Sequence, residues 1–208
     1  MKIALATNCV YKVEPEYIRH TDDYKRQYCG KWGIDYIRTN ENPLPNLHAV
    51  WSKIPLVIED LKKYDWVVWM DADATTIGMD FDLNAYLLTI NDKVVIQKDK
   101  LNWNAGVFAV SNGKRTLEWL DHIYGMRTNP RYNNGWREQQ AMIDSFKSGW
   151  GDVVEVPPKG IGWNSYLSIY GRNDDPNLYE DGHWCLHIPG KPDSLRNRIF
   201  RNKEWIGR

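Results

Sequence analysis

Two hydrophobic periods alternate along this chain, one typical of β-strands and the other of α-helices. Short apolar or alternating runs predict strands over residues 2–6, 34–37, 66–70, 93–97, 103–110 and 152–156. Apolar residues spaced three and four apart predict helices over residues 14–32, 54–61, 116–124 and 137–146. Strands that alternate with helices in this way are typical of an α/β domain.

The remaining segments carry weaker structural signals. Residues 42–46 form a predicted loop, and Pro55 has to occupy the first turn of its helix or kink it. From Lys159 onward the chain is rich in glycine, asparagine and aromatic residues and shows little periodicity. We expect this last quarter to lie irregularly over the strand ends, so that all 208 residues form one domain.

Two carboxylates directly follow one apolar predicted strand. Residues 66–70 run into Asp71 and Asp73, and side chains two residues apart lie on the same side of an extended strand. Two like charges at this spacing repel each other and lose solvation when partly buried, and a divalent cation relieves both costs. Oxygen ligands of this kind suit Mn²⁺ or Mg²⁺. The pattern predicts a metal site; the alternative is a solvated strand end followed by a turn.

A metal held by only two carboxylates would be loosely bound, so a third protein ligand is expected. His187 is the best candidate because imidazole is an acceptable ligand for Mn²⁺. Nearby, Gly190 would let the backbone approach a ligand closely, and Lys191 could neutralise phosphate oxygens. The alternative is an ordinary histidine in a surface loop.

Composition and charge narrow the classes of function. Lysine plus arginine and aspartate plus glutamate number 27 each, which gives no support for a nucleic-acid or membrane-surface binder. No run approaches the roughly 20 apolar residues of a membrane span, and the N-terminal apolar stretch is too short for a secretory signal. Three cysteines are too few for a disulfide framework. We therefore expect a cytoplasmic protein without a membrane span.

Aromatic content is high, with 11 Trp and 12 Tyr but only 4 Phe. Tryptophan and tyrosine combine an apolar face with a polar tip, which suits stacking on sugar rings or bases. We nevertheless expect more than half of them to fill the core.

Three other groups of residues could contribute to a site. The amide of Asn104 lies beside small residues that leave room for a ligand, unless this segment is a bulge in a buried strand. Glu138 and Gln139 begin a predicted helix, where the helix dipole favours a carboxylate, unless this is an ordinary acidic first turn. Lys53 precedes an apolar helical stripe and is either part of the site or a solvated helix charge.

In order and spacing, these motifs are similar to those of a known family. The matching segments are Tyr28-Cys29, residues 51–56, residues 66–74, residues 104–108, residues 138–142, and His187 with Gly190-Lys191. The set resembles the galactosyl/xylosyl transferase family that includes plant xyloglucan xylosyltransferases and fungal α-galactosyl and α-mannosyl transferases. The likeness spans residues 28–195.

The resemblance implies a GT-A fold, which is a single Rossmann-like α/β domain with a mixed central sheet flanked by helices. We expect residues 1–112 to form the nucleotide-sugar and metal half, and residues 113–208 to form the acceptor half and a C-terminal closing loop. The resemblance also implies a nucleotide-sugar donor, Mn²⁺ or alternatively Mg²⁺, and transfer with retention of the anomeric configuration.

Carried over by position, the resemblance assigns the metal to Asp71, Asp73 and His187. It assigns donor binding to Thr7, Asn8, Lys53, Asp71, Ala72, Asn104, Ala105, Gly106, Gly190 and Lys191, with the first two near the nucleoside and the last two at the diphosphate. Glu138 and Gln139 are implied to lie beside the anomeric carbon.

The chain departs from this family in two respects. Many relatives have two adjacent acidic residues where this chain has Arg137-Glu138. Relatives usually carry a membrane anchor and stem, whereas this chain starts at its first predicted strand, which favours a cytoplasmic enzyme in a bacterial or viral setting.

We therefore predict a metal-dependent retaining glycosyltransferase that moves galactose or xylose from a UDP-sugar to a glycan or other hydroxyl acceptor. Because Gln139 is a poor nucleophile, we favour same-face attack, in which the departing phosphate oxygen takes the acceptor proton. Glu138 would orient the acceptor or stabilise charge. Two alternatives stay open: a non-catalytic carbohydrate-binding module that uses the aromatic residues, and a metal-dependent sugar-nucleotide hydrolase.

Overall fold

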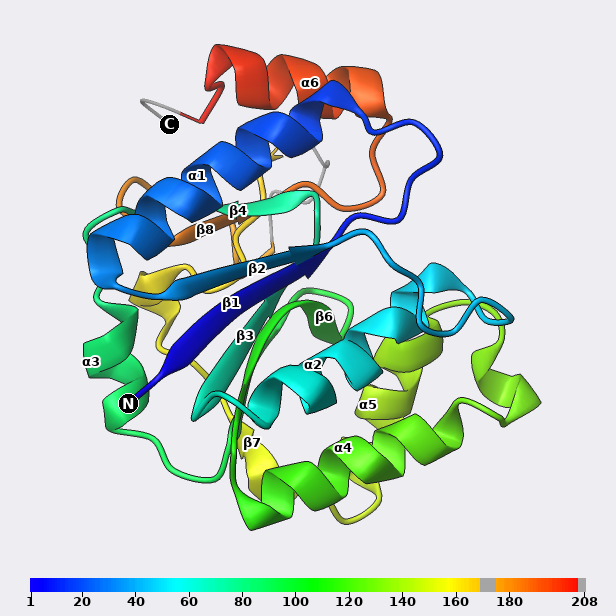
Figure 1. The fold of residues 1–208 in the computed structure, drawn as a ribbon. Coiled ribbons are helices and arrows are strands. Elements are labelled where there is room, and N and C mark those ends of the chain that lie inside the picture. Colours follow the sequence, from blue (N-terminus) through cyan, green and yellow to red (C-terminus); the bar gives the residue numbers. More distant parts are fainter. Residues whose placement is uncertain (169–174, 206–208) are drawn as a thin grey trace.

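The computed structural model describes residues 1–168 and 175–205 and contains alternating strands and helices (Figure 1). The strands are β1 (Ile3–Asn8), β2 (Asp35–Thr39), β3 (Trp66–Met70), β4 (Ala74–Thr76), β5 (Val94–Lys98), β6 (Trp103–Ser111), β7 (Val154–Glu155) and β8 (Cys185–His187). The helices are α1 (Glu16–Trp32), α2 (Lys53–Leu61), α3 (Leu83–Leu88), α4 (Lys114–Met126), α5 (Arg137–Lys147) and α6 (Asp193–Asn202). Short 3₁₀ turns occupy Ala49–Ser52, Pro130–Tyr132, Gly151–Val153 and Lys159–Ile161.

Six strands form a mixed central sheet in the order β2-β1-β3-β6-β5-β7. Strands β2, β1 and β3 are parallel, β6 runs antiparallel to both β3 and β5, and β7 is parallel to β5. The predicted α/β fold class with a mixed sheet flanked by helices is confirmed. At its carboxyl end, β3 lies between the carboxyl end of parallel β1 and the start of antiparallel β6. Asp71, which directly follows β3, therefore lies at a junction of three strands.

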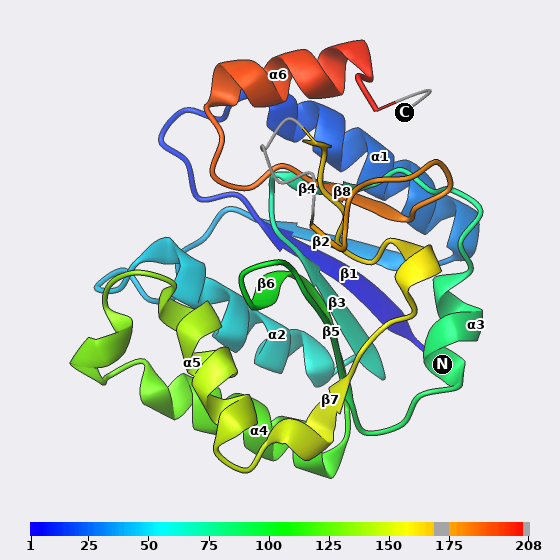
Figure 2. The same cartoon turned by 180° about the vertical axis from the view of Figure 1, so that it is seen from behind.

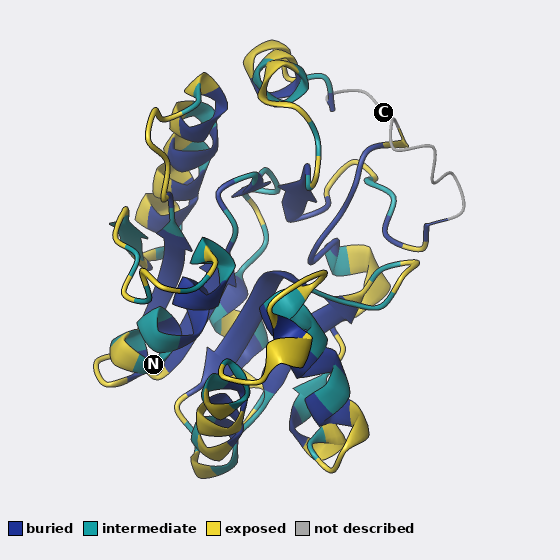
Figure 3. Ribbon diagram, turned by 90° about the vertical axis from the view of Figure 1, so that its right-hand side faces the viewer, coloured by how far each residue is buried: buried dark blue, intermediate teal, exposed yellow. Residues whose placement is uncertain are grey.

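Strand β3 is buried on both faces because it sends alternate side chains into two cores. Val67 and Trp69 pack with α2, α4 and α5 on one side of the sheet. Trp66, Val68 and Met70 pack on the other side, with residues of α1 and α3. Figure 2 shows the same two layers from behind, and Figure 3 shows the buried strands of the sheet between half-exposed helices. This burial explains why the strand reads as a continuous apolar run.

The expectation that the last quarter is irregular was wrong for β8 and α6. Strand β8 pairs with β4 in a separate two-stranded sheet, with Ala74 opposite His187. Each of these strands is three residues long, so no local period could reveal them; the pairing depends on residues more than 100 positions apart. Helix α6 packs against α1 through Ile199 and Phe200, but its other positions are mostly polar, which hid its period.

Other local predictions are confirmed. Pro55 is the third residue of α2, within its first turn, as the missing N–H of proline requires. Within residues 1–168 and 175–205, the chain forms no helix with the length and apolar character needed to cross a bilayer.

Most of the tryptophans fill the core, as expected, whereas among the described tyrosines only Tyr17, Tyr28, Tyr132 and Tyr166 are buried. The seven buried tryptophans are Trp51, Trp66, Trp69, Trp119, Trp163, Trp184 and Trp205, out of 11 in the chain. Trp136, which is 42% exposed, is the one tryptophan with an exposed side chain. The tryptophans of this chain therefore form no broad exposed surface.

Gly78 offers a test of the close approach between the loop after β4 and the segment leading into β8. A Cβ atom at Gly78 would lie 2.7 Å from the carbonyl oxygen of His183 and 2.8 Å from the Cα atom of Trp184. Because these are backbone atoms, Gly78→Ala should lower the free energy of unfolding by about 1–3 kcal/mol. Urea unfolding followed by circular dichroism measures this change.

Gly125→Ala is the matched control, because a Cβ there, in α4, would meet nothing within 4 Å. It should leave stability unchanged or raise it by roughly 0.5–1 kcal/mol through the better helix propensity of alanine. Equal losses in the two variants would show that the β4–β8 contact does not constrain residue 78.

Candidate active site

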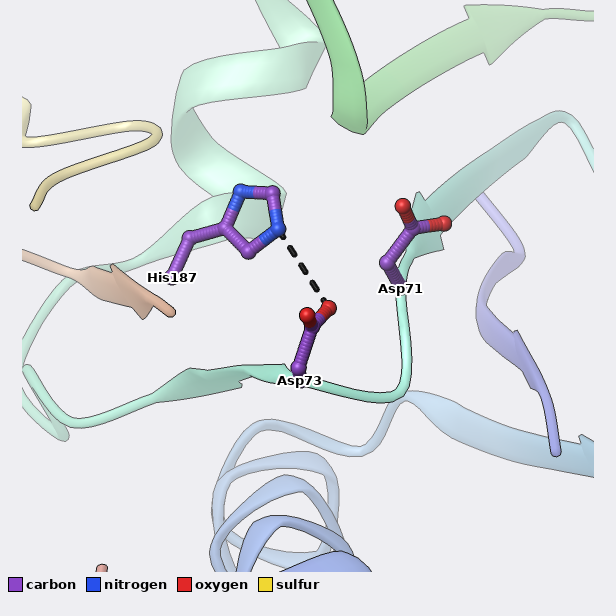
Figure 4. A group of neighbouring side chains, drawn as sticks. All are labelled: Asp71, Asp73 and His187. Carbon is purple, nitrogen blue, oxygen red and sulfur yellow. Dashed lines mark ion pairs between the residues drawn. The ribbon is translucent and has the colours of Figure 1, made fainter. Parts of the chain in front are cut away.

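Asp71, Asp73 and His187 converge beyond the carboxyl end of β3 (Figure 4). One ligand atom from each lies within 4.8 Å of the other two. The two aspartates approach each other through a turn, in which the N–H of Ala74 donates to the Asp71 carbonyl at 3.0 Å. The approach of Asp71 to Asp73 was predicted correctly, but the expectation that the strand stays extended through both residues was wrong. A turn brings the carboxylates together where a straight strand would only align them.

The backbone of this turn is held from three directions. The N–H of Asp71 donates to the carbonyl of Gly106 at 2.8 Å, and the hydroxyl of Thr21 donates to the carbonyl of Ala72 at 2.9 Å. The ammonium of Lys25 donates to the carbonyl of Asp71 at 3.2 Å. Lys25 is fully buried, and this desolvation lowers its pKa. The turn therefore has little freedom to open.

Asp73 is contacted by two basic side chains from the C-terminal segment. Its Oδ1 lies 3.4 Å from Nε2 of His187, and its Oδ2 accepts a hydrogen bond of 2.5 Å from Arg196 of α6. Desolvation raises the pKa of Asp73, but the hydrogen bond and charge of His187 and the charge of Arg196 outweigh it, so the pKa lies below the ordinary value. Asp73 is thus an ionised carboxylate at neutral pH.

The residues of this cluster fit a divalent cation. Two carboxylates and an imidazole nitrogen form a donor set that suits Mn²⁺ better than a purely oxygen-seeking ion. Asp73 keeps Oδ1 directed toward His187 while Arg196 engages only Oδ2, so one oxygen faces the other two ligand residues (Figure 4).

Lys53 joins the cluster to α5. It is 3% exposed, and its ammonium lies 3.1 Å from Oδ1 of Asp71, 3.0 Å from Oε1 of Glu138 and 3.1 Å from the carbonyl of Ala105. Burial lowers the pKa of Lys53, but the two carboxylates outweigh it and raise the pKa above its ordinary value. The alternative of a solvated helix charge was wrong for Lys53.

Glu138 and Gln139 each contact another element of the site, Glu138 through Lys53 of α2 and Gln139 through the start of β6. Glu138 is 5% exposed and pairs with Lys53, so it is not an ordinary solvated first-turn residue. Gln139 accepts a hydrogen bond of 3.0 Å from the N–H of Ala105. Arg137 just before them has φ of 44°, a conformation that costs a non-glycine residue energy and that concentrates at functional sites.

The start of β6 packs closely against His187. A Cβ atom at Gly106 would lie 2.2 Å from Cε1 of His187, so glycine is required for the ring to sit where it does. The side chain of Asn104 is engaged within the protein: it accepts from the N–H of Gly106 at 2.9 Å and donates to Asp99 at 3.1 Å. The predicted space beside Asn104 is therefore used by the histidine ring.

A pocket of about 220 Å³ adjoins the cluster on the side of β1 and α2. It is lined by Asn8, Val10, Tyr11, Ala49, Val50, Ser52, Lys53, Trp69, Asp71, Ala72 and Asp73. The amide of Asn8 donates to Ser52 at 2.8 Å, while its buried Oδ1 has no partner in the described part of the chain.

Thr7, Gly190 and Lys191, which were also predicted to bind the donor, do not line this pocket. Thr7 is 1% exposed, and its hydroxyl lies 3.5 Å from the ammonium of Lys25. Gly190 and Lys191 lie in the loop between β8 and α6, where Gly190 adopts a φ of 64°. They follow His187 by three and four residues. Their predicted contact with a diphosphate stays a prediction.

The sequence analysis did not predict several residues of the site. Trp69 donates to Oδ1 of Asp71 at 2.7 Å, Arg196 binds Asp73, and Asn164 contacts His187. Trp69 could have been found, because it lies two residues before Asp71 on the same apolar strand. Arg196 and Asn164 lie in the segment that was taken as irregular, and no spacing in the sequence links them to Asp73 or His187.

Comparison with known proteins points to one group of enzymes. The model of the galactosyl transferase GMA12/MNN10 family matches residues 3–93. A probable glycosyltransferase 6 of Oryza sativa subsp. indica is 32% identical over 108 residues, which are 47% of this chain and 22% of that protein. A putative glycosyltransferase 7 of Arabidopsis thaliana is 28% identical over 196 residues, which are 86% of this chain and 43% of that protein.

Over residues 3–93, the chain is similar to the galactosyl transferase GMA12/MNN10 family. The resemblance inferred from the motifs is thereby confirmed, and alignments to relatives also cover most of the chain beyond residue 93. An uncharacterized alpha-1,2-galactosyltransferase of Schizosaccharomyces pombe is 24% identical, over 84% of this chain and 56% of that protein. The chain thus spans between a fifth and rather more than half the length of these relatives.

Solved structures confirm the GT-A fold. A glycosyltransferase involved in the glycosylation of the major capsid of PBCV-1 superposes with a TM-score of 0.79 at 16% identity, over 97% of this chain and 100% of that one. The galactosyltransferase LgtC, solved with donor and acceptor sugar analogs, gives a TM-score of 0.58 at 13% identity, over 100% of this chain and 99% of that one. At these identities the likeness establishes the fold.

The Asp73–Arg196 pair gives a pH-dependent prediction for the metal-free protein. Arg196→Gln removes a buried cation, so the free energy of unfolding at pH 7 should fall by about 1–3 kcal/mol. The pKa of Asp73 is lowered in the folded state, so its contribution is present above about pH 4 and is lost as the pH falls through the folded value. The difference between the variant and the wild type should therefore narrow in acid, as measured by urea unfolding in EDTA.

Arg198→Gln is the control, since Arg198 lies on the same helix and pairs with Glu204 at 3.0 Å, but its side chain is 58% exposed. It should change stability by less than about 0.5 kcal/mol at either pH. A loss for Arg196→Gln that is the same at pH 7 and pH 3 would contradict the role of the ion pair.

Proposed function

We propose that this chain is a metal-dependent retaining glycosyltransferase that transfers galactose or xylose from a UDP-sugar to the hydroxyl group of a glycan or another acceptor. The observation that carries the proposal is the convergence of Asp71, Asp73 and His187 at the edge of a pocket, within a GT-A fold. Relatives named as an alpha-1,2-galactosyltransferase and as xyloglucan 6-xylosyltransferase 2 support these two sugars.

In this proposal Asp71, Asp73 and His187 hold Mn²⁺ or Mg²⁺, and the pocket beside them takes the nucleotide. The cation, when bound, would offset the charge that develops on the diphosphate leaving group. Lys191 and the backbone at Gly190 complete the diphosphate site, because a lysine at that loop can add a second positive charge. Asn8 contributes its unpaired Oδ1 to the nucleoside side of the pocket.

Lys53 and Glu138 prepare the sugar side of the site. Lys53 is held between Asp71 and Glu138, so its charge is placed before the donor binds. Glu138 is bound to this lysine, and the side-chain oxygen of Gln139 is bound to the N–H of Ala105. Gln139 is a poor nucleophile and the Glu138 carboxylate is ion-paired with Lys53, so we favour same-face attack with the departing phosphate oxygen taking the acceptor proton. Glu138 then orients the acceptor or stabilises charge.

The alternatives receive less support. A carbohydrate-binding module without chemistry needs exposed aromatic surface, and Trp136 is the one exposed tryptophan. A sugar-nucleotide hydrolase would use the same metal residues, and it differs only in releasing free sugar without preference for an acceptor.

Asp73→Asn tests the metal assignment together with the reaction. The wild type, incubated with Mn²⁺ and a panel of nucleotide sugars, should release nucleotide from UDP-galactose or UDP-xylose, and EDTA should abolish this release. Asp73→Asn should lower the rate at least about 100-fold, because one anionic ligand is lost, a loss of roughly 3 kcal/mol in transition-state stabilisation. Product analysis with and without an acceptor distinguishes transfer from hydrolysis.

Asp80→Asn serves as the control because the side chain of Asp80 is 99% exposed and pairs only with Lys31 at 2.6 Å. It should keep the wild-type rate. UDP, but not GDP, should raise the melting temperature in the presence of Mn²⁺, since a ligand that binds only the folded state stabilises it. Nucleotide release that is insensitive to EDTA would refute metal dependence.

Glu138→Gln tests the sugar side of the site. The substitution keeps the shape but removes the negative charge beside Lys53, so kcat should fall about 10- to 1,000-fold, with a smaller change in KM for the donor. Steady-state kinetics with a UDP-sugar and a glycan acceptor measure both constants. Glu118→Gln, at an exposed carboxylate 3.7 Å from Arg115, should leave both unchanged. Full transfer activity in Glu138→Gln would remove this residue from the mechanism.

A further inference from the structure

A continuous chain of hydrogen bonds leads from the start of β6 to the predicted metal ligand His187. It passes through Asn104 of β6 and Asn164, which is fully buried in the segment before β8. Among the described residues, neither amide forms a hydrogen bond with Asp71 or Asp73, so the proposed site gives them no direct role at the metal.

The first amide has a fixed orientation because both of its partners are unambiguous. The backbone N–H of Gly106 can only donate, and it lies 2.9 Å from Oδ1 of Asn104. The carboxylate of Asp99 can only accept, and it lies 3.1 Å from Nδ2 of Asn104. The oxygen of Asn104 must therefore point toward Gly106, and its NH₂ group toward Asp99.

The orientation of the Asn164 amide follows from that of the Asn104 amide. The atom of Asn164 that lies 3.0 Å from the oxygen of Asn104 has to donate, so it is Nδ2. The remaining atom, Oδ1, then accepts, and it lies 2.9 Å from Nδ1 of His187. The backbone N–H of Asn164 also donates to Gln97 at 3.0 Å, which holds the residue in place. Nδ1 of His187 must therefore carry the proton.

We propose that Asn164, oriented by Asn104, fixes the tautomer of His187 so that Nε2 presents a lone pair toward Asp73. A neutral imidazole carries one N–H, so a proton held on Nδ1 leaves Nε2 unprotonated. Nε2 and Oδ1 of Asp73 are 3.4 Å apart. In the charged imidazolium a proton on Nε2 links the two atoms, and in the neutral ring the Nε2 lone pair faces the same point, where a cation can replace that proton. The ring lies directly against Gly106, where a Cβ atom would be 2.2 Å from Cε1 and 2.8 Å from Nδ1.

The inference rests on the proposed function for its purpose, because the lone pair matters only if the site binds a metal. Hydrogen bonds that fix the tautomer of a ligating histidine are worth about 10- to 100-fold in metal affinity. Asn104 and Asn164 are thus positioning residues that act through His187.

The first experiment reads the tautomer in the metal-free protein. ¹⁵N-labelled histidine and long-range ¹H–¹⁵N spectra at alkaline pH distinguish a ring protonated on Nδ1 from one protonated on Nε2. The wild type should show His187 as the Nδ1–H tautomer, and Asn164→Ala should shift it toward Nε2–H, because Asp73 then becomes the better acceptor. Asn164→Asp keeps an acceptor beside Nδ1 and should retain the wild-type tautomer.

The second experiment measures Mn²⁺ affinity by the electron paramagnetic resonance signal of free Mn²⁺. Asn164→Ala should bind Mn²⁺ about 10- to 100-fold more weakly than the wild type, and Asn164→Asp should recover most of the loss. Asn84→Ala is the matched control, since Asn84 also makes one amide hydrogen bond, of 3.0 Å to the carbonyl of Trp32, away from the site. It should match the wild type in Mn²⁺ affinity, while its melting temperature controls for general destabilisation.

The outcomes separate this inference from the proposed function. If Asn164→Ala keeps the Nδ1–H tautomer and the wild-type Mn²⁺ affinity, the inference is overturned, whatever the activity of the enzyme. If the wild type binds no Mn²⁺, the proposed metal dependence fails, and the tautomer measurement still decides the role of Asn164. A loss of the tautomer in Asn164→Ala that is rescued by Asn164→Asp supports the inference.

Discussion

The compensation of buried charge at the carboxyl end of β3 is the constraint on which the rest of the site depends. Asp71 and Asp73 are brought together by a turn, in a region where isolated carboxylates would lose their solvation. The compensating groups arrive from α2 with Lys53, from β8 with His187 and from α6 with Arg196. Each of these elements is therefore held in place by electrostatics as well as by packing.

This constraint explains why the C-terminal segment folds back over the sheet. Without α6, Arg196 could not reach Asp73, and without the β4–β8 pair His187 would not face it. The apolar contacts of Ile199 and Phe200 with α1 give the segment its hydrophobic anchor. Packing and charge thus act on the same segment, and the segment completes a site whose first residues lie in the N-terminal half.

The sequence alone was sufficient for those features that a local period or a short motif encodes. The strands of the central sheet, the helices α1, α2, α4 and α5, and the pairing of Asp71 with Asp73 belong to this class. The environment of Lys53 could not be predicted, because a lysine at a helix start can be either solvated or buried. Its burial depends on a partner such as Glu138, which lies far from it in the sequence. Arg196 and Asn164 could not be predicted, since their roles come from contacts across more than 100 and 20 positions, respectively.

The register of the small sheet has a consequence for how the protein is synthesised. Ala74 lies opposite His187, so the chain between them has to be made before the two strands can meet. A nascent chain that already contains both aspartates still lacks the imidazole that joins them in the cluster and the guanidinium that pairs with Asp73. The ligand set of the proposed metal site is therefore complete only after the carboxyl-terminal strand has been synthesised and has docked.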